Sequence, residues 1–468
     1  MVGTVVAVVL AAGAGTRFGG GKLLASVDGR PILQHVLDRL AAAGLDDIVV
    51  VLGDDASAME AAIAWRAERR VVNADPARGL ASSVQLGISA VPPDAAAALI
   101  VLGDQPDVPL DALRAVASAP GDAERPIVVP RYDRDKGRNP VRLERAAFSL
   151  VHAISGDRGL GPLLTARPEL VREVDVGAAD NPDIDTRADL VARLERAWAA
   201  RVHANNDQVD RHREVPDGAD FYAPVTSLFR ADPTRTDEPV LQELLMLVRP
   251  GETWLDIGAG AGRYALPLAR ELAASGGRVI AVDPSRGMLD ALRTTADEHA
   301  IDNVDVVEGR WPEVAGEVGV ADVSLIAHVS YDIAAIGPFF AAMEAATRRV
   351  CVAVLMERQP SSIADACWPS TWGEDRVPLP ALPEVVELLR AHGRRPLVRM
   401  LERVPRRFGS RAELTGFLRR QLWVAEGSEA DQRFLEALEP LIEVDDDGGV
   451  GLVGQRPLPI GVVTWRPR

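Results

Sequence analysis

Leu10-Ala-Ala-Gly-Ala-Gly-Thr-Arg-Phe-Gly-Gly-Gly-Lys22 follows an apolar run near the start of the chain and ends in a lysine. That lysine is unusual, because the chain holds 52 Lys and Arg residues and only Lys22 and Lys136 are lysines. A compact ammonium on a flexible stem can reach a crowded phosphate where a planar guanidinium fits poorly. Glycines let backbone N–H groups turn toward an anion without interference from a Cβ atom. The stretch therefore predicts a loop that holds a triphosphate.

The composition is that of a globular protein with more than one domain. The chain has 468 residues, enough for two or three domains with cores of their own, and 47% of them are apolar. Its net charge of −16 argues against general affinity for nucleic acid or for a membrane surface. No signal peptide or membrane-spanning stretch is apparent, and the two cysteines, Cys351 and Cys367, suit a reducing compartment. We therefore expect a cytoplasmic protein that acts on small molecules.

Strand and helix patterns alternate along the first half, stop, and start again. Strands are predicted at 5–10, 48–52, 70–73, 98–102 and 127–130, and helices at 31–43 and 110–118. A second strand that leads into a glycine-rich loop begins at Thr253. Such alternation is typical of a mostly parallel sheet with helices on both faces. We predict an α/β fold of two Rossmann-like, three-layer α/β/α domains, residues 1–198 and 218–468, joined by a polar linker at 199–217.

Four further segments of the first half carry polar residues at strand ends or in glycine turns: Gly79-Leu-Ala-Ser-Ser83, Leu102-Gly-Asp-Gln-Pro106, the pair Arg138-Asn-Pro140 and Gly156-Asp-Arg-Gly159, and Asp183-Ile-Asp-Thr186. Together with the loop that ends at Lys22, they resemble in order the motifs of the nucleotidyltransferase family that includes the molybdenum cofactor cytidylyl- and guanylyltransferases (MobA-like). The resemblance covers residues 5–190. It implies transfer of a nucleoside monophosphate from an NTP to a phosphorylated acceptor, the molybdenum cofactor, with release of pyrophosphate.

Nucleotidyl transfer suggests a role for each of these motifs. The reaction needs positioning and charge neutralisation more than covalent work by the protein. We expect Lys22 and Arg17 to neutralise the triphosphate as catalytic residues. Asp104 and Asp185 are expected to hold Mg²⁺ against it, with Asp183 as the competitor of Asp185. Lys136 is expected to lie in a solvated loop. Nucleotide contacts are expected from Leu10, Ala11, Ala12, Gly13, Gly15, Lys22, Ser82 and Ser83.

The base and the acceptor leave alternatives open. The run Leu10-Ala-Ala-Gly13 is similar to the cytidylyl-type members, whereas the guanylyl-type reads Leu-Ala-Gly-Gly, so CTP is favoured over GTP. Related folds act on sugar phosphates and other phosphorylated metabolites. A second interpretation is a domain with one inactive site that binds molybdenum cofactor or inserts it as a chaperone. On either interpretation a molybdenum enzyme or its chaperone is the macromolecular partner to expect.

Trp254-Leu-Asp-Ile-Gly-Ala-Gly-Ala-Gly-Arg263 and Val279-Ile-Ala-Val-Asp-Pro-Ser285 both contain a strand with an acidic residue near its end. They resemble the class I S-adenosylmethionine-dependent methyltransferases, over residues 220–465. Methyl transfer depends mainly on alignment of donor and acceptor. His328, just past a strand, is the candidate to deprotonate the acceptor, and a structural histidine is the alternative. An NAD-linked oxidoreductase is the rival function for this half. Cofactor contacts are expected from Asp256, Gly258, Gly260, Gly262, Asp283, Glu308 and Trp311, the last by stacking on adenine.

The last third of the chain adds features whose chemistry stays open. Ser410-Arg-Ala-Glu413 and Ser428-Glu-Ala-Asp431 have the pattern of helix starts. Residues 451–453 and 460–465 are expected to close the second sheet as an antiparallel pair. Core packing is expected for at least one of Trp368 and Trp372. A run of arginines either binds an anionic acceptor or forms a solvated face, and the second interpretation is favoured: Arg394, Arg395, Arg399, Arg403, Arg406 and Arg407.

Overall fold

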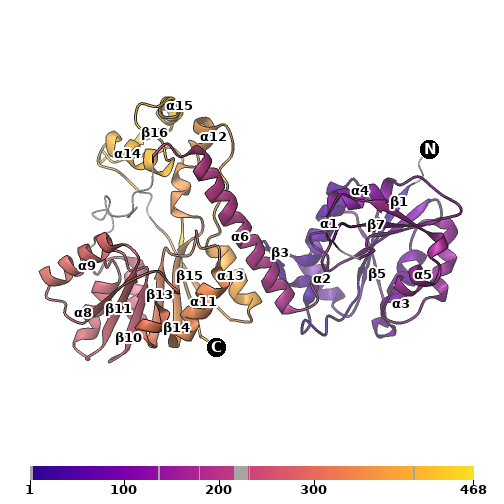
Figure 1. Cartoon of the computed structure of the whole chain (residues 1–468), viewed down its shortest axis with the longest axis horizontal. Coiled ribbons are helices and arrows are strands. Elements are labelled where there is room, and N and C mark those ends of the chain that lie inside the picture. Colours follow the sequence, from indigo (N-terminus) through magenta and orange to yellow (C-terminus); the bar gives the residue numbers. More distant parts are fainter. Residues whose placement is uncertain (1–3, 135–136, 179, 216–229, 231, 404–405) are drawn as a thin grey trace. The chain divides into compact units, whose positions relative to one another are not determined.

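The chain folds into two compact units, Met1–Ala192 and Arg193–Arg468. The computed structural model describes residues 4–134, 137–178, 180–215, 230, 232–403 and 406–468, so Lys136 lies outside the described residues. Each unit is a β-sheet with helices packed against it (Figure 1). The predicted class, two α/β domains with mostly parallel sheets, is confirmed.

The first unit is built on a seven-stranded sheet in which β4, β1 and β6 are parallel neighbours. β8 is antiparallel to both β6 and β7, which makes the sheet mixed on one side. Every strand predicted in this half is present within one residue of its expected bounds. The order across the sheet is β5 (Arg69–Val72), β4 (Ile48–Leu52), β1 (Val5–Ala11), β6 (Ala97–Leu102), β8 (Val141–Glu144), β7 (Ile127–Arg131) and β9 (Val171–Asp175).

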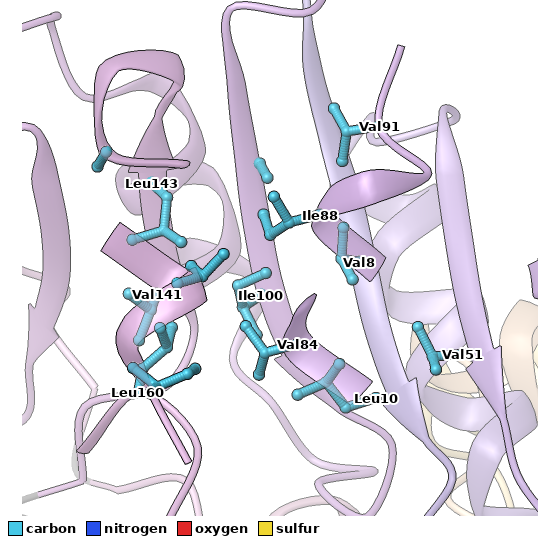
Figure 2. Packing of buried hydrophobic residues seen from close by; sticks show 14 of the residues in the cluster. Val8, Leu10, Val51, Val84, Ile88, Val91, Ile100, Val141, Leu143 and Leu160 are labelled. Carbon is cyan, nitrogen blue, oxygen red and sulfur yellow. The ribbon is translucent and has the colours of Figure 1, made fainter. Parts of the chain in front are cut away.

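Helices bury β1 on both faces, which explains its uninterrupted apolar sequence. Figure 2 shows one of these layers, where Val84 and Ile88 of α3 lie over Val8 of β1 and Ile100 of β6. Because β1 and β6 are parallel, the loop that ends at Lys22 and the turn at Asp104 leave the sheet at the same edge. The helices of this unit are α1 (Ile32–Ala42), α2 (Ala56–Ala62), α3 (Leu80–Ser89), α4 (Leu110–Ser118) and α5 (Gly161–Ala166).

The second unit contains another seven-stranded sheet, with six strands that run in one direction and one antiparallel strand, β18, between β14 and β15. Since β18 opposes both neighbours, β15 runs in the same direction as β14. The order is β12 (Val304–Glu308), β11 (Arg278–Asp283), β10 (Thr253–Ile257), β13 (Ala321–Ala327), β14 (Thr347–Met356), β18 (Ile460–Trp465) and β15 (Leu397–Leu401). The helices around it are α7 (Pro239–Leu247), α8 (Ala265–Ala273), α9 (Arg286–Glu298), α10 (Ala315–Val318), α11 (Ile336–Ala345) and α13 (Leu382–Ala391).

The expected pairing of residues 451–453 with 460–465 is wrong. β17 (Val450–Leu452) pairs instead with β16 (Ile442–Val444), in a separate two-stranded sheet. The cause is local, because the Asp445 amide donates to the Gly449 carbonyl and the Asp445 carboxylate accepts from the Gly449 amide. This short turn returns the chain directly onto the strand that precedes it.

A small group of helices between β14 and β18 has its own apolar core. It contains α12 (Trp368–Trp372), α14 (Arg411–Gln421) and α15 (Glu429–Leu438), which lie together in Figure 1. Ser410 and Ser428 accept hydrogen bonds from the amides of Glu413 and Asp431, so both predicted helix starts are confirmed. Trp368 is fully buried in this core, as expected for one of the two tryptophans.

The segment predicted as a linker, residues 199–217, is helical as far as His212. It belongs to α6 (Arg187–His212), a helix of 26 residues. The polar residues that suggested a linker are used inside the second unit, because the side-chain amides of Asn205 and Gln208 donate to the carbonyls of Val377 and Asp375. Among the residues that the structure describes, no helix has both the length and the apolar character needed to cross a membrane.

The packing of α3 on β1 can be tested at Gly87. A Cβ atom there would overlap Cγ1 of Val8, so Gly87→Ala should lower the stability of the first unit by about 1–3 kcal/mol despite the better helix propensity of Ala. Gly416 also lies inside a helix but has open space around it, so Gly416→Ala should stabilise by about 0.5–1 kcal/mol. Calorimetric unfolding of both variants measures the difference; a Gly87→Ala protein at least as stable as wild type would contradict the packing.

Candidate active sites

Lys22 lies between two carboxylates at the carboxyl edge of the first sheet. Its Nζ is 2.5 Å from Oδ2 of Asp104 and 3.3 Å from Oδ1 of Asp185. Asp104 follows β6, whereas Asp185 follows β9 and is brought near by the bond from the Ile184 amide to the Asp104 carbonyl. Burial opposes the charge on Lys22, but the two carboxylates outweigh it and raise the pKa of Lys22 above its ordinary value. The structure therefore brings together three of the predicted residues.

Arg17 contacts the cluster of Lys22, Asp104 and Asp185, whereas Asp183 is bound to a different side chain. Arg17 is mostly exposed and its guanidinium lies 3.1 Å from Oδ2 of Asp185. Asp183 instead accepts a hydrogen bond of 2.5 Å from the Gln105 side chain. Burial, together with the nearby charge of Asp104, raises the pKa of Asp183 to about 6. Of the two candidates in the closing motif, Asp185 is the one that faces Lys22.

The carboxylates suit a magnesium ion that shares its coordination with phosphates. Oδ1 of Asp104 is buried and has no hydrogen-bond partner in the described ranges, which is a costly state for a carboxylate oxygen. Within the described residues no cluster of three or more His, Cys, Asp or Glu side chains forms a metal site. Magnesium is commonly held by one or two carboxylates and completed by water and substrate phosphates. Asp104 and Asp185 fit that pattern.

The turn after β1 closes on the carbonyl of Gly15. The amides of Phe18, Gly19 and Gly20 donate to it over 3.0–3.1 Å. Gly15 has a φ of 57°, and a Cβ atom on it would lie 3.1 Å from Cβ of Lys22. Glycine at this position therefore lets the chain return closely enough to place Lys22 beside the end of β1.

Ser82 and Ser83, at the start of α3, both accept hydrogen bonds from the Asn73 side chain, at 2.9 and 3.0 Å. Ser83 is almost completely buried, so it supports the turn, whereas Ser82 is partly exposed. Asn73 was missed in the sequence as a site residue. Asn73 could have been found from the sequence, because it is the polar last residue of the strand predicted at 70–73.

The motifs at 79–83 and 156–159 lie against one another. A Cβ atom on Gly79 would come within 2.5 Å of the backbone of Gly156, which requires glycine at that contact. Beside them a pocket of about 250 Å³ opens at the ends of β1 and β6. Polar side chains from the motifs at 138–140 and 156–159 meet here, among apolar walls; the lining of the pocket includes Leu10, Leu102, Arg138, Asn139, Arg158 and Thr165.

The second unit carries a glycine turn between β10 and α8. Gly258, Gly260 and Gly262 all have positive φ, at 75°, 54° and 83°. Asp283, at the end of β11, accepts 2.8 Å hydrogen bonds from the amides of Gly260 and Ser285. This contact joins the two acidic motifs into one site.

Asp256 is buried at the end of β10, and within the described part of the chain its Oδ1 has no hydrogen-bond partner. Burial and the neighbouring Asp283 raise its pKa to about 7. A buried carboxylate that is only partly hydrogen-bonded, beside a glycine turn, has capacity left for donors from a ligand. The turn, Asp256 and Asp283 therefore fit a nucleoside cofactor with hydroxyl and ammonium groups.

Glu308 and Trp311 have different surroundings. Glu308 is exposed at the end of β12 and lies beside Asp283 in the strand register. Trp311 is 6% exposed and donates its indole N–H to the Phe339 carbonyl, so it packs in the core. Stacking of Trp311 on adenine stays a prediction, and it requires the ring to become uncovered.

His328 follows β13 in a strained turn. Its φ is 57°, and Ser330 has a φ of 96°, both unusual for residues with side chains. His328 Nδ1 lies 3.5 Å from the Tyr331 hydroxyl. Burial, with the charges of Arg403 and Arg263, lowers the pKa of His328 to about 4. The imidazole is therefore neutral at pH 7 and is a weaker base than an ordinary histidine.

Comparison with known proteins matches each half of the chain to a known domain family. Residues 7–172 match the family model of the MobA-like NTP transferase domain, and residues 255–349 match that of a methyltransferase domain. Nicotine blue oxidoreductase of Paenarthrobacter nicotinovorans is 32% identical over 195 residues, which cover 39% of this chain and 92% of that protein. The bifunctional protein GlmU of Sphingopyxis alaskensis is 35% identical over 127 residues, and the chain spans only 28% of its length. Rv0371c of Mycobacterium tuberculosis H37Rv is 33% identical, with a TM-score of 0.37, over 41% of this chain and 96% of that one.

The buried Asp256 predicts a pH dependence of stability. The folded chain keeps the Asp256 proton up to a pH of about 7, while the unfolded chain loses it near 3.8. Stability should therefore fall as pH rises through this window, by at most about 1.4 kcal/mol per pH unit. Asp256→Asn should remove this decline and be more stable than wild type at pH 8, whereas the exposed Asp302→Asn should follow wild type. Urea unfolding at pH 5 and pH 8 measures this; a loss of equal size at both pH values would refute it.

Proposed function

Since the chain belongs to the MobA-like NTP transferase family and carries a methyltransferase domain after it, we propose that it is a bifunctional enzyme. The first unit transfers a nucleoside monophosphate to a phosphorylated acceptor, and the second methylates a small molecule. The observation that supports the first activity most directly is the position of Lys22 between Asp104 and Asp185. A cation and two carboxylates at the end of parallel strands are what a metal–triphosphate complex requires.

In the first site, Asp104 and Asp185 would hold Mg²⁺, which supplies charge neutralisation on the phosphates when bound. Lys22 then exchanges a carboxylate partner for a phosphate oxygen and stays fully charged, because its pKa is raised. Arg17, which is exposed, can swing toward the outer phosphates. The amides of Phe18, Gly19 and Gly20 are occupied by Gly15, so phosphate contacts of this loop fall to the amides before them.

The sequence Leu10-Ala-Ala-Gly13 favours CTP as donor, with GTP as the alternative. The pocket lined by Arg138, Asn139 and Arg158 suits the acceptor, because its two guanidinium groups can bind a phosphate. Molybdenum cofactor is the acceptor that the family resemblance supports, and a molybdenum enzyme or its chaperone would then receive the product.

In the second site, Asp283 and the glycine turn would hold S-adenosylmethionine, which supplies an electrophilic methyl group when bound. Asp283 presents a carboxylate to the ribose hydroxyls, and Asp256 offers its unpaired oxygen to the same ligand. His328, neutral and placed at the end of β13, accepts the proton of the acceptor.

A second candidate function for the first unit is redox chemistry. It is favoured by the 32% identity to a protein named nicotine blue oxidoreductase, 92% of which is matched. The charged group at Lys22 favours the transferase. Full-length protein that oxidises NADH or NADPH with a quinone-like dye, and releases no pyrophosphate from any NTP, would decide for the oxidoreductase.

The transferase is tested by pyrophosphate release from CTP and GTP with Mg²⁺ and molybdenum cofactor. We expect release with wild type and a fall of about 100-fold or more in Asp104→Asn, because the metal and Lys22 both lose a charged partner. Asp111 is exposed on α4, so Asp111→Asn should behave as wild type. Normal turnover in Asp104→Asn would remove Asp104 from the site, and binding of the acceptor by wild type without pyrophosphate release would support a carrier.

The methyltransferase site is tested by calorimetry with S-adenosylhomocysteine. Asp283→Ala should weaken binding by about 1–3 kcal/mol, since it leaves the ribose hydroxyls and the Gly260 amide without their acceptor. Asp290 lies exposed on α9, and Asp290→Ala should leave the affinity unchanged. Binding of NADH in place of S-adenosylhomocysteine would establish the oxidoreductase alternative for this unit.

A further inference from the structure

We propose that the methyl acceptor of the second unit is a small oxyanion, and that Arg403 binds its negative group while its nucleophilic group faces His328. This inference rests on the proposed methyltransferase function and adds the class of the substrate. It concerns the arginine run 394–407, for which the sequence favoured a solvated face.

The sheet places Arg403 at the edge where His328 lies. β13 and β14 are parallel, and the His328 amide donates to the Val354 carbonyl of β14. Met356, at the end of β14, pairs with Ile460, which pairs on its other side with Leu401 of β15. Because β15 runs in the direction of β14, Arg403 leaves the sheet at the same carboxyl edge.

Short contacts connect the two residues. The guanidinium of Arg403 lies 3.9 Å from Sδ of Met356. The Met356 amide donates to the Tyr331 hydroxyl at 2.8 Å, and that hydroxyl lies 3.5 Å from His328 Nδ1. The charge of Arg403 also contributes to the lowered pKa of His328. These contacts connect the guanidinium to the imidazole through Met356 and Tyr331.

Three arginines of the run, Arg394, Arg399 and Arg407, pair with carboxylates, whereas Arg395, Arg403 and Arg406 form no ion pair with the described residues. Arg394 pairs with Glu344, and Arg399 pairs with Glu243 at 3.0 Å. Arg407 pairs with Glu443 and Asp445. Among the described residues, Arg403 forms an ion pair with no carboxylate. Its neighbour Arg406 also has none there and lies over the rings of Phe408 and Phe417.

Arg403 and Arg406 lie near enough for their charges to interact, and neither is paired with a carboxylate among the described residues. Burial and the charge of Arg403 lower the pKa of Arg406, so their mutual repulsion is appreciable. An anion would remove this repulsion, and a guanidinium presents paired donors that match a carboxylate or a phosphate.

The turn after β13 carries a second signal for a polar ligand. Ser330 is 1% exposed, and its Oγ has no hydrogen-bond partner among the residues that the structure describes. The turn that holds it is strained, with positive φ at both His328 and Ser330. Val329 lies between these two residues and packs closely on Gly258. A Cβ atom on Gly258 would overlap the Val329 side chain. The strained turn thus lies against the glycine turn assigned to the cofactor, with an unsatisfied hydroxyl.

The test uses full-length protein saturated with S-adenosylhomocysteine and two matched pairs of small probes. Lactate is compared with lactamide, and glycerol phosphate with glycerol, by saturation-transfer NMR titration. We expect wild type to bind the anion of at least one pair tenfold or more tightly than its neutral counterpart. The pair that shows the preference distinguishes a carboxylate from a phosphate. Arg403→Gln should abolish the preference, and Arg403→Lys should retain part of it.

The control is Arg395→Gln, which removes the same charge before β15, at the opposite edge of the sheet, and should keep the preference. Equal affinity for anion and neutral probe in wild type, or a preference that survives Arg403→Gln, overturns the inference. Calorimetry with S-adenosylhomocysteine on the same samples separates failure of the oxyanion acceptor from failure of the methyltransferase function. Normal binding with no charge preference removes only the oxyanion acceptor, whereas no binding removes the methyltransferase function as well.

Discussion

The ammonium of Lys22 is the charge on which the first site depends. It lies against Asp104 and Asp185, two carboxylates that follow different strands, and without it their repulsion would oppose the closing of residues 183–186 onto β6. The same contacts indicate how a ligand would bind. A metal ion would replace Lys22 as the positive partner of the two carboxylates, and a polyphosphate would replace the carboxylates as the negative partner of Lys22. An arginine would reach the carboxylates with a wider, planar group. The retention of lysine in an arginine-rich chain follows from that geometry.

In the second unit, backbone amides rather than a lysine hold the carboxylate of the site in place. Asp283 is held by the amides of Gly260 and Ser285, so the carboxylate that would face a ribose is already oriented before any ligand binds. Asp256 behind it is buried and only partly satisfied, which costs stability at neutral pH. Such a cost is common where a ligand completes the hydrogen bonds. Both units place these groups at the carboxyl ends of parallel strands, where backbone geometry leaves open loops.

The acceptor sides of the two sites depend on contacts that are distant in sequence. In the first unit, Gly79 and Gly156 touch, which brings the loops at 138–140 and 156–159 to one pocket. In the second, β18 separates β14 from β15 but leaves their carboxyl ends at one edge, which places Arg403 beside Met356. The substrate classes that we propose follow from these two juxtapositions.

The sequence by itself determined the two α/β units, five of the seven strands of the first sheet and the loops that carry Lys22, Asp104, Asp256 and Asp283, because these depend on local periodicity and on the positions of glycine. It did not determine the pairing of β17, the helical state of residues 199–212 or the partners of the arginine run. Those were decided by the tertiary structure, since a polar residue looks the same in a sequence whether it faces water or a buried carbonyl, as Asn205 does. The choice of Asp185 over Asp183 beside Lys22 has the same cause: two carboxylates in one short motif differ only in what the folded chain brings to each.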